Sequence, residues 1–164
     1  HGDGLKREIE RCVAACRGSR TQLFINDHWR EAVAAGAYGV HLGQEDMDTA
    51  DFAAIAAAGL RLGLSTHSLE EMDRALALHP SYVASGAVFP TATKDMPTAP
   101  QGLERLRGQV VRAGGTPVVA IGGITLDNGA DVLATGVASL AVVSAVTKAE
   151  NPEAAVKSFQ ALWK

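Results

Sequence analysis

The sequence predicts an α/β fold in which short parallel strands alternate with helices, and within that class a (β/α)8 TIM barrel. Short apolar runs alternate with amphipathic segments six times along the chain. The runs are apolar at nearly every position, as expected of parallel strands that are buried on both faces. Polar residues follow most of the runs, whereas a doubly wound sheet would concentrate them at one switch point. The pattern therefore favours the barrel.

The order of the expected elements follows from apolar spacing and from glycines at helix ends. A first helix is expected at residues 5–17. Strands are then predicted at 22–26, 38–42, 61–65, 82–86, 117–121 and 139–143, and helices at 27–35, 47–58, 68–78, 101–113, 127–135 and 152–162. Eight units complete a barrel. We therefore expect residues 1–164 to form a single barrel domain that lacks the N-terminal β-α-β segment, and to need that upstream segment for activity.

Composition narrows the class of protein. The chain has 164 residues, 47% of them hydrophobic, and a net charge of −3. Acidic and basic residues are mixed, so no basic stripe points to nucleic acid and no polybasic segment points to a membrane. Cys12 and Cys16 lie four residues apart on the first expected helix, where a disulfide is geometrically awkward. We interpret them as buried thiols of a cytoplasmic protein.

Two acidic residues suggest a metal site. Asp27 follows the run Phe24-Ile25-Asn26, and Asp46 lies just beyond Val40-His41-Leu42. Neighbouring parallel strands lie about 5 Å apart, so these carboxylates are expected side by side. A Mg²⁺ ion held by one or two carboxylates, with water and substrate phosphate, would relieve their repulsion. The alternative is that each acid caps the helix that follows it.

Three later segments have the residue types that bind phosphate. Paired glycines, Gly122 and Gly123, end the fifth expected strand, and Val143 and Ser144 end the sixth. Barrels often bind phosphate between the loops of their last two strands. The loop after the fourth strand contributes two hydroxyls and one cation, those of Thr91, Thr93 and Lys94. The alternatives are a tight turn for the glycines and a solvated loop for the others.

The strand-end residue His67 has two interpretations that the sequence leaves open. It could transfer protons, or it could only satisfy local backbone groups.

Five segments together resemble the thiamine phosphate synthase family. They are FINDHWREAVAAGAYGVHLGQED, GLRLGLSTHS, VFPTATK, VAIGGI and AVVSAV, in that order and spacing. The resemblance runs from about residue 22 to the end of the chain. It implies a (β/α)8 barrel that joins 4-amino-2-methyl-5-hydroxymethylpyrimidine diphosphate to a thiazole phosphate, giving thiamine phosphate and pyrophosphate, with Mg²⁺ required. The implied partners are these small molecules, while the sequence does not decide between a monomer and a homo-oligomer.

The resemblance also implies a role for individual residues. Asp27 and Asp46 would be the magnesium ligands. Asn26 would lie beside the pyrimidine diphosphate, and Ser65 and Lys94 would contact the diphosphate or the departing pyrophosphate. The thiazole phosphate would be held by side chains and backbone at Thr91, Thr93, Gly122, Gly123, Val143 and Ser144. No nucleophile–base pair is needed, because loss of pyrophosphate would leave a cation that the aminopyrimidine stabilises.

The sequence leaves open two alternatives to the synthase function. One is a related barrel, the thiazole tautomerase, which acts on the thiazole phosphate alone without metal and for which His67 would be suited. The other is a phosphate-binding remnant without catalysis. The family's Gln-x-Arg-x-Lys-type segment, which grips the pyrimidine diphosphate, has no match in this sequence. The strand-end motifs around Asp46 and Lys94 nevertheless fit the synthase better than the tautomerase.

Overall fold

The structure is a computed structural model that describes residues 2–91 and 99–163. It consists of parallel strands covered by helices. The chain divides into two compact units. The first consists of His1–Ser65 with His79–Ser81, and the second of Thr66–Leu78 with Tyr82–Lys164.

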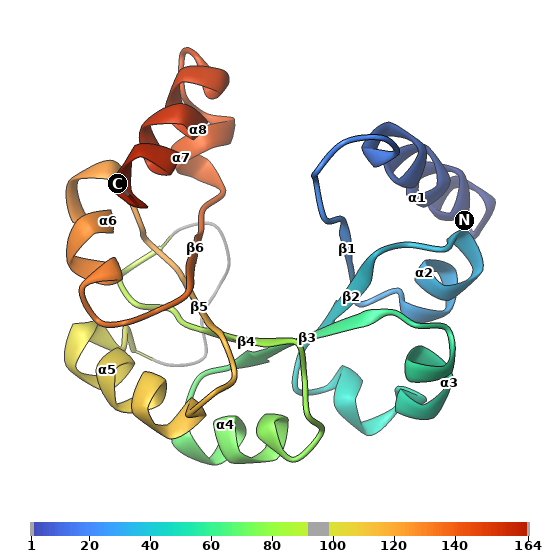
Figure 1. The fold of residues 1–164 in the computed structure, drawn as a ribbon, viewed down its shortest axis with the longest axis horizontal. Helices are drawn as coiled ribbons and strands as arrows, with labels where there is room; N and C mark the ends of the chain where they lie inside the picture. Colours follow the sequence, from blue (N-terminus) through green and yellow to red (C-terminus); the bar gives the residue numbers. More distant parts are fainter. Residues whose placement is uncertain (1, 92–98, 164) are drawn as a thin grey trace. The chain divides into compact units, whose positions relative to one another are not determined.

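The first unit contains three strands that pair in parallel in the order β1-β2-β3. The pairing places Ile25 opposite Val40, and Val40 opposite Leu62. Its helices lie together on one side of these strands (Figure 1). The elements are α1 (Gly2–Cys16), β1 (Phe24–Asn26), α2 (Trp29–Ala35), β2 (Gly39–Leu42), the 3-10 helix η1 (Asp46–Asp48), α3 (Phe52–Ala57) and β3 (Arg61–Thr66), whose last residue belongs to the second unit.

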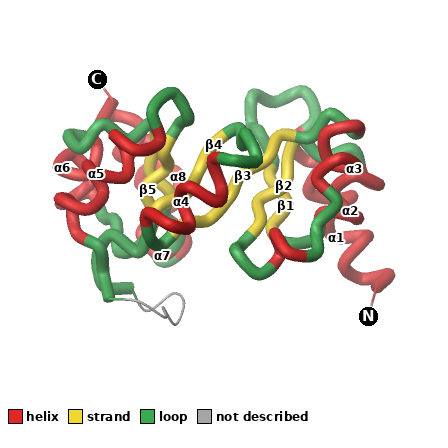
Figure 2. Tube along the Cα trace, turned by 90° about the horizontal axis from the view of Figure 1, so that it is seen from below, coloured by secondary structure: helices red, strands yellow, loops and turns green. Residues whose placement is uncertain are grey.

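The second unit repeats this arrangement, with three parallel strands in the order β4-β5-β6. Ala84 lies opposite Val119, and Ala120 lies opposite Leu140. Figure 2 shows helices and strands in separate colours from a second direction. The elements are α4 (Leu69–Leu76), β4 (Tyr82–Ser85), α5 (Gly102–Ala113), β5 (Val118–Ile121), α6 (Leu126–Leu133), β6 (Ser139–Ala141), α7 (Ser144–Thr147), α8 (Pro152–Gln160) and the 3-10 helix η2 (Ala161–Trp163).

Each unit has an apolar core between its strands and helices. In the first unit the side chains of Val40, Leu42 and Leu64 are fully buried. In the second unit the fully buried side chains include those of Met72, Val83, Leu106 and Val132. Short strands of this kind can be buried on both faces because helices cover one side and side chains of neighbouring strands fill the other.

All six predicted strands are present, and every pair within a unit is parallel, so the α/β class with parallel strands is confirmed. Ser68 caps the start of α4, since its hydroxyl oxygen accepts the N–H of Glu71 at 3.2 Å. Among the residues described, no helix combines the length and the apolar character that crossing a bilayer requires.

Three expectations differ from the structure in detail. The helix predicted at 47–58 is interrupted, because the carboxylate of Asp51 accepts the N–H of Ala54 at 2.9 Å and starts a new helix there. The short helix α7 was not predicted, since four residues carry too little periodicity. The expectation of buried thiols is wrong: Cys12 and Cys16 are free and half-buried, because α1 buries only Ile9.

Close packing at the start of β2 excludes any side chain at Gly39. A Cβ there would lie 2.4 Å from Cε1 of Phe24 and 2.7 Å from the carbonyl oxygen of Arg61. The aromatic ring of Phe24 already packs edge-on against Tyr38, with centroids 5.6 Å apart. The carbonyl belongs to the backbone of the paired strand β3, which cannot move aside as a side chain can.

We predict that Gly39→Ala lowers the free energy of unfolding by about 1–3 kcal/mol, because overpacking of this size costs that much. Gly108→Ala is the matched control. Gly108 lies inside α5 with no atom within 4 Å of its Cβ position, so alanine there should raise stability by up to about 1 kcal/mol. Urea or thermal unfolding measures both, and equal midpoints for wild type and Gly39→Ala would contradict the packing argument.

Candidate functional site

Asp27 begins the loop that follows β1 in the first unit. Its N–H donates to the carbonyl oxygen of His41 at 2.9 Å, which extends the β1–β2 pairing by one residue. Its φ angle is +64°, in the left-handed region. Aspartate tolerates this region better than most residues, and such backbone often occurs at functional sites. The side chain is exposed at the carboxyl end of the strand pair.

Asp46 lies in the loop after β2, the strand that pairs with β1. Its Oδ2 accepts the N–H of Gly43 at 3.0 Å, which fixes the half-buried carboxylate over the end of the strand. The N-cap of α2 is His28, whose side chain makes no capping bond, and that of α3 is Asp51. Neither Asp27 nor Asp46 is therefore the N-cap of the α-helix that follows it, contrary to the capping alternative.

The donor set of this acidic pair, Asp27 and Asp46, fits magnesium. Both residues supply carboxylate oxygens, which Mg²⁺ prefers, and both follow the ends of paired strands. Within residues 2–91 and 99–163, no group of three or more His, Cys, Asp or Glu converges in the way that an all-protein metal site requires. One or two carboxylates with water and substrate phosphate is the usual magnesium arrangement.

Ser65 lies at the end of β3 in the same unit and is held by two side chains of the preceding strand and loop. Its Oγ lies 2.8 Å from Nε2 of His41, and its carbonyl oxygen accepts the Nε2–H of Gln44 at 2.7 Å. Burial lowers the pKa of His41, so the imidazole is neutral at pH 7. Asn26, which pairs with His41 in the ladder, is exposed at the end of β1.

His41 is a site residue that the sequence motifs did not predict. A polar residue between the buried Val40 and Leu42 was the available signal, since alternate residues of a strand face opposite sides. A histidine at such a position needs a partner, and here Ser65 provides one.

The glycine pair after β5 has a structural reason of its own in the second unit. Gly122 and Gly123 have φ angles of +100° and +64°. A Cβ on Gly122 would lie 2.5 Å from Cβ of Ala87, and one on Gly123 would lie 2.5 Å from the carbonyl oxygen of Pro90. The turn and the segment after β4 are joined by backbone bonds, Val88 to Ile121 at 3.0 Å and Phe89 to Gly122 at 3.1 Å.

The turn is also held from the following helix. Asn128 of α6 donates its Nδ2–H to the carbonyl oxygen of Gly123 at 3.0 Å, and its Oδ1 accepts the N–H of Thr125 at 2.9 Å. The backbone around Gly122 and Gly123 is therefore preorganised. Whether it binds an anion stays a prediction.

Val143 and Ser144 lie where β6 passes into α7 and are both exposed. Because Ile121 pairs with Ala141, the loops after β5 and β6 leave neighbouring strand ends, as predicted for a phosphate site. Thr91 is described and half-buried. Thr93 and Lys94 lie outside the described residues.

His67 is held by its own helix. The carboxylate oxygen Oε2 of Glu71 accepts the backbone N–H of His67 at 2.7 Å and lies 2.8 Å from its ring Nδ1. This contact ties the ring to the start of α4. The partner of the ring is a side-chain carboxylate and not a backbone group, so the structure does not decide between the two interpretations of His67.

Two buried glutamines, Gln101 at the N-cap of α5 and Gln109 within α5, hold the end of β4. The hydroxyl of Ser85 donates to Oε1 of Gln109, and Nε2 of Gln101 donates to the carbonyl oxygen of Gly86 at 2.5 Å. Gln109 shares the buried face of the helix with Leu106 and Ala113. A polar residue at that helical spacing was the sequence signal that could have identified it.

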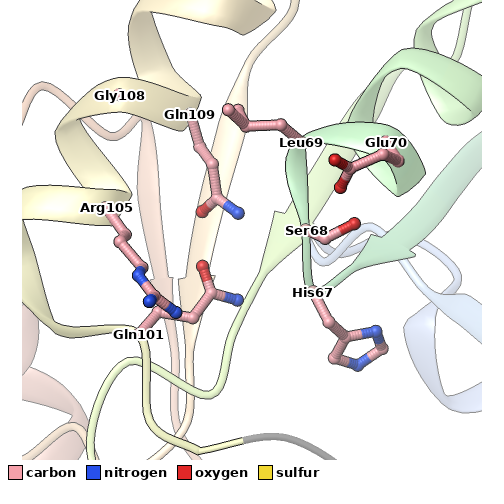
Figure 3. Close-up of a pocket in the computed structure, with 8 residues that line it drawn as sticks. All are labelled: His67, Ser68, Leu69, Glu70, Gln101, Arg105, Gly108 and Gln109. Carbon is pink, nitrogen blue, oxygen red and sulfur yellow. The ribbon is translucent and has the colours of Figure 1, made fainter.

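A cavity of 320 Å³ lies beside these glutamines (Figure 3). Figure 3 shows the amides of Gln101, just before α5, and Gln109, in α5, extending toward one another, with Leu69 and Glu70 of α4 across from them. Oε1 of Gln101 is buried and has no hydrogen-bond partner among the residues that the structure describes. The lining residues are His67, Ser68, Leu69, Glu70, Gln101, Arg105, Gly108 and Gln109, and of these the sequence suggested a functional role only for His67.

Comparison with known proteins gives one consistent result. The sequence model of the thiamine monophosphate synthase family matches residues 2–146. The thiamine-phosphate synthase of Neisseria meningitidis serogroup A is 80% identical over 163 residues, which cover 99% of this chain and 80% of that protein. The thiamine-phosphate synthase of Citrobacter koseri is 58% identical over 144 residues, covering 88% of this chain and 68% of that protein.

A solved structure agrees. The thiamine phosphate pyrophosphorylase from Pyrococcus furiosus superposes with a TM-score of 0.82 at 36% identity, covering 96% of this chain and 76% of that one. The family resemblance seen in the sequence is therefore confirmed across almost all of the chain. The chain belongs to the thiamine monophosphate synthase family.

Proposed function

We propose that the protein is a thiamine-phosphate synthase, a transferase that joins 4-amino-2-methyl-5-hydroxymethylpyrimidine diphosphate to a thiazole phosphate and releases pyrophosphate. The observation that carries this proposal is the 80% identity over 163 residues to the thiamine-phosphate synthase of N. meningitidis. The preorganised loops at the strand ends of each unit support it. They provide carboxylates in the first unit and a glycine turn held by backbone hydrogen bonds in the second.

The first unit would bind the diphosphate end of the pyrimidine substrate. Asp27 and Asp46 would hold Mg²⁺, which when bound supplies positive charge to the departing pyrophosphate. Asn26 is exposed beside them and would bind the same substrate. The Ser65 hydroxyl would donate a hydrogen bond to a diphosphate oxygen. Lys94, which lies outside the described residues, would add a second cation to the leaving group.

The second unit would bind the thiazole phosphate. Backbone N–H groups at Gly122 and Gly123 would bind the phosphate, because glycine has no side chain of its own between its N–H and an anion. Ser144 and the backbone at Val143 would contribute from the neighbouring loop, with the hydroxyls of Thr91 and Thr93 from the loop after β4.

The proposed reaction is dissociative and needs no side-chain nucleophile. The bond from the pyrimidine methylene to the diphosphate breaks first, and the electron-rich aminopyrimidine stabilises the resulting cation. The thiazole nitrogen then forms the new bond. The residues named above would act by orienting the two substrates and by stabilising the negative charge that develops on pyrophosphate.

Further parts of the proposal rest on the sequence and on fold likeness. The (β/α)8 barrel is supported by the P. furiosus structure, with its TM-score of 0.82. Small-molecule partners follow from the proposed reaction. A cytoplasmic location is inferred from the sequence, and a homo-oligomer stays open.

The proposal is tested by incubating the full-length protein with both substrates and Mg²⁺ and measuring thiamine phosphate and pyrophosphate. We expect the two products in equal amounts, and none when either substrate is left out. Conversion of a thiazole phosphate isomer in the absence of the pyrimidine would instead favour the tautomerase alternative. Phosphate binding without product would favour the non-catalytic one.

We predict that Asp27→Asn lowers kcat/KM by more than about 100-fold, because the substitution removes a carboxylate ligand of magnesium. Loss of a residue that only hydrogen-bonds to a metal ligand typically lowers activity by about ten- to hundredfold, and loss of a ligand itself should cost more. Asparagine is tolerated at positive φ, so the unfolding midpoint should change little. Steady-state kinetics across a magnesium titration, together with thermal unfolding, makes both measurements.

The matched control for this prediction is Asp48→Asn, the same chemical change at an exposed residue of η1. It should leave the magnesium dependence as in the wild type. Wild-type turnover of Asp27→Asn at low magnesium concentration would show that the metal assignment is wrong.

We predict that Ser144→Ala raises the KM for thiazole phosphate by roughly tenfold or more, since a hydrogen bond to a charged group contributes about 1.5–3 kcal/mol. The KM for the pyrimidine diphosphate should stay unchanged. Thr147→Ala, at the exposed far end of α7, is the control and should affect neither constant. Equal changes in both KM values would contradict a specific contact between Ser144 and the thiazole phosphate.

A further inference from the structure

We propose that His41 is a positioning residue for the transfer reaction, donating its Nε2–H to Oγ of Ser65 so that the Ser65 hydroxyl proton points to the substrate diphosphate. The inference rests on the proposed function, in which Ser65 contacts the diphosphate. It adds a residue of the strand interior to a site otherwise built from strand ends.

Two side chains, one from the neighbouring strand and one from the loop after it, hold Ser65 in place. Nε2 of His41 lies 2.8 Å from the Ser65 hydroxyl oxygen. Nε2 of Gln44 donates to the Ser65 carbonyl oxygen at 2.7 Å, so the backbone of Ser65 is fixed as well as its side chain. Both contacts lie inside the first unit, where β2 and β3 pair residue by residue from Gly39 to Leu42.

Counting protons determines which group must donate. A serine hydroxyl has one proton and can also accept hydrogen bonds. Diphosphate oxygens at neutral pH only accept. If the Ser65 proton were donated to His41, the hydroxyl would face the diphosphate with lone pairs alone, and the contact would be repulsive. The pair stabilises the substrate only when His41 is the donor.

The proton position on the His41 ring decides whether this contact can form. A neutral imidazole has a single proton, on either Nδ1 or Nε2, and only the Nε2–H tautomer can donate to the Ser65 oxygen. The side chain is half-buried between the fully buried Val40 and Leu42. The ring contacts the Ser65 hydroxyl across the β2–β3 pair, and as a donor it would fix the rotation of that hydroxyl.

The kinetic test compares two substitutions of His41. Glutamine can place an amide N–H near the position of Nε2, whereas methionine has similar length without a donor. We expect His41→Met to lower kcat/KM for the pyrimidine diphosphate by roughly threefold to tenfold, the value of one hydrogen bond. His41→Gln should restore most of it. The KM for thiazole phosphate should be unchanged in both variants, because the proposal places His41 at the diphosphate alone.

A double-mutant cycle shows whether His41 acts through Ser65. In the Ser65→Ala background, His41→Met should change kcat/KM by less than about twofold, because the hydroxyl it orients is gone. A full loss on top of Ser65→Ala would overturn the proposal. Thermal unfolding of each variant confirms that folded protein is compared.

A spectroscopic test does not depend on activity. In ¹⁵N-histidine-labelled protein at neutral pH, the His41 ring signals, assigned by their loss in His41→Gln, should show Nε2 protonated and Nδ1 unprotonated. The reverse tautomer would overturn the proposal even in an active enzyme. If the tautomer is as expected but no thiamine phosphate is formed, the proposed function fails while the donor assignment stands, which separates the two failures.

Discussion

The parallel direction of neighbouring strands is the constraint from which the rest of each unit follows. Parallel strands need a crossover between them, so every strand is followed by a helix, and the helices cover one side of the strands. The same direction sends all strand ends of a unit to one edge. Asp27, Asp46 and Ser65 share that edge in the first unit, and Gly122 and Ser144 share it in the second.

Polar groups inside the second unit hold its loops in place. The buried amides of Gln101 and Gln109 engage the two residues at the end of β4, Gly86 and Ser85. Glycines at positions 122 and 123 then allow the next turn to approach the segment after β4 closely enough for backbone hydrogen bonds. Buried hydrogen bonds of this kind favour one arrangement of the loops. A buried polar group that loses its partner costs more free energy than an intact hydrogen bond contributes to stability.

The sequence predicted the strands well because short apolar runs separated by glycines leave few alternatives. The prediction was wrong where a single side chain ends or starts a helix. At Asp51 the carboxylate caps the start of α3 and so divides one expected helix into two. The strand-end acids and glycines were visible as patterns, and the family resemblance gave them roles. The pairing of His41 with Ser65 could not be predicted, since it depends on the register between β2 and β3, which the separate strands do not encode.

The burial of His41 has a consequence for behaviour in acid. Its pKa in the folded protein is below the value of 6.5 of an exposed histidine, so the unfolded chain takes up the proton more readily. The contribution of this residue to stability is complete above pH 6.5 and is lost as the pH falls toward and below the folded pKa. Mild acidification therefore weakens the first unit from within its strands, through the same ring that contacts Ser65.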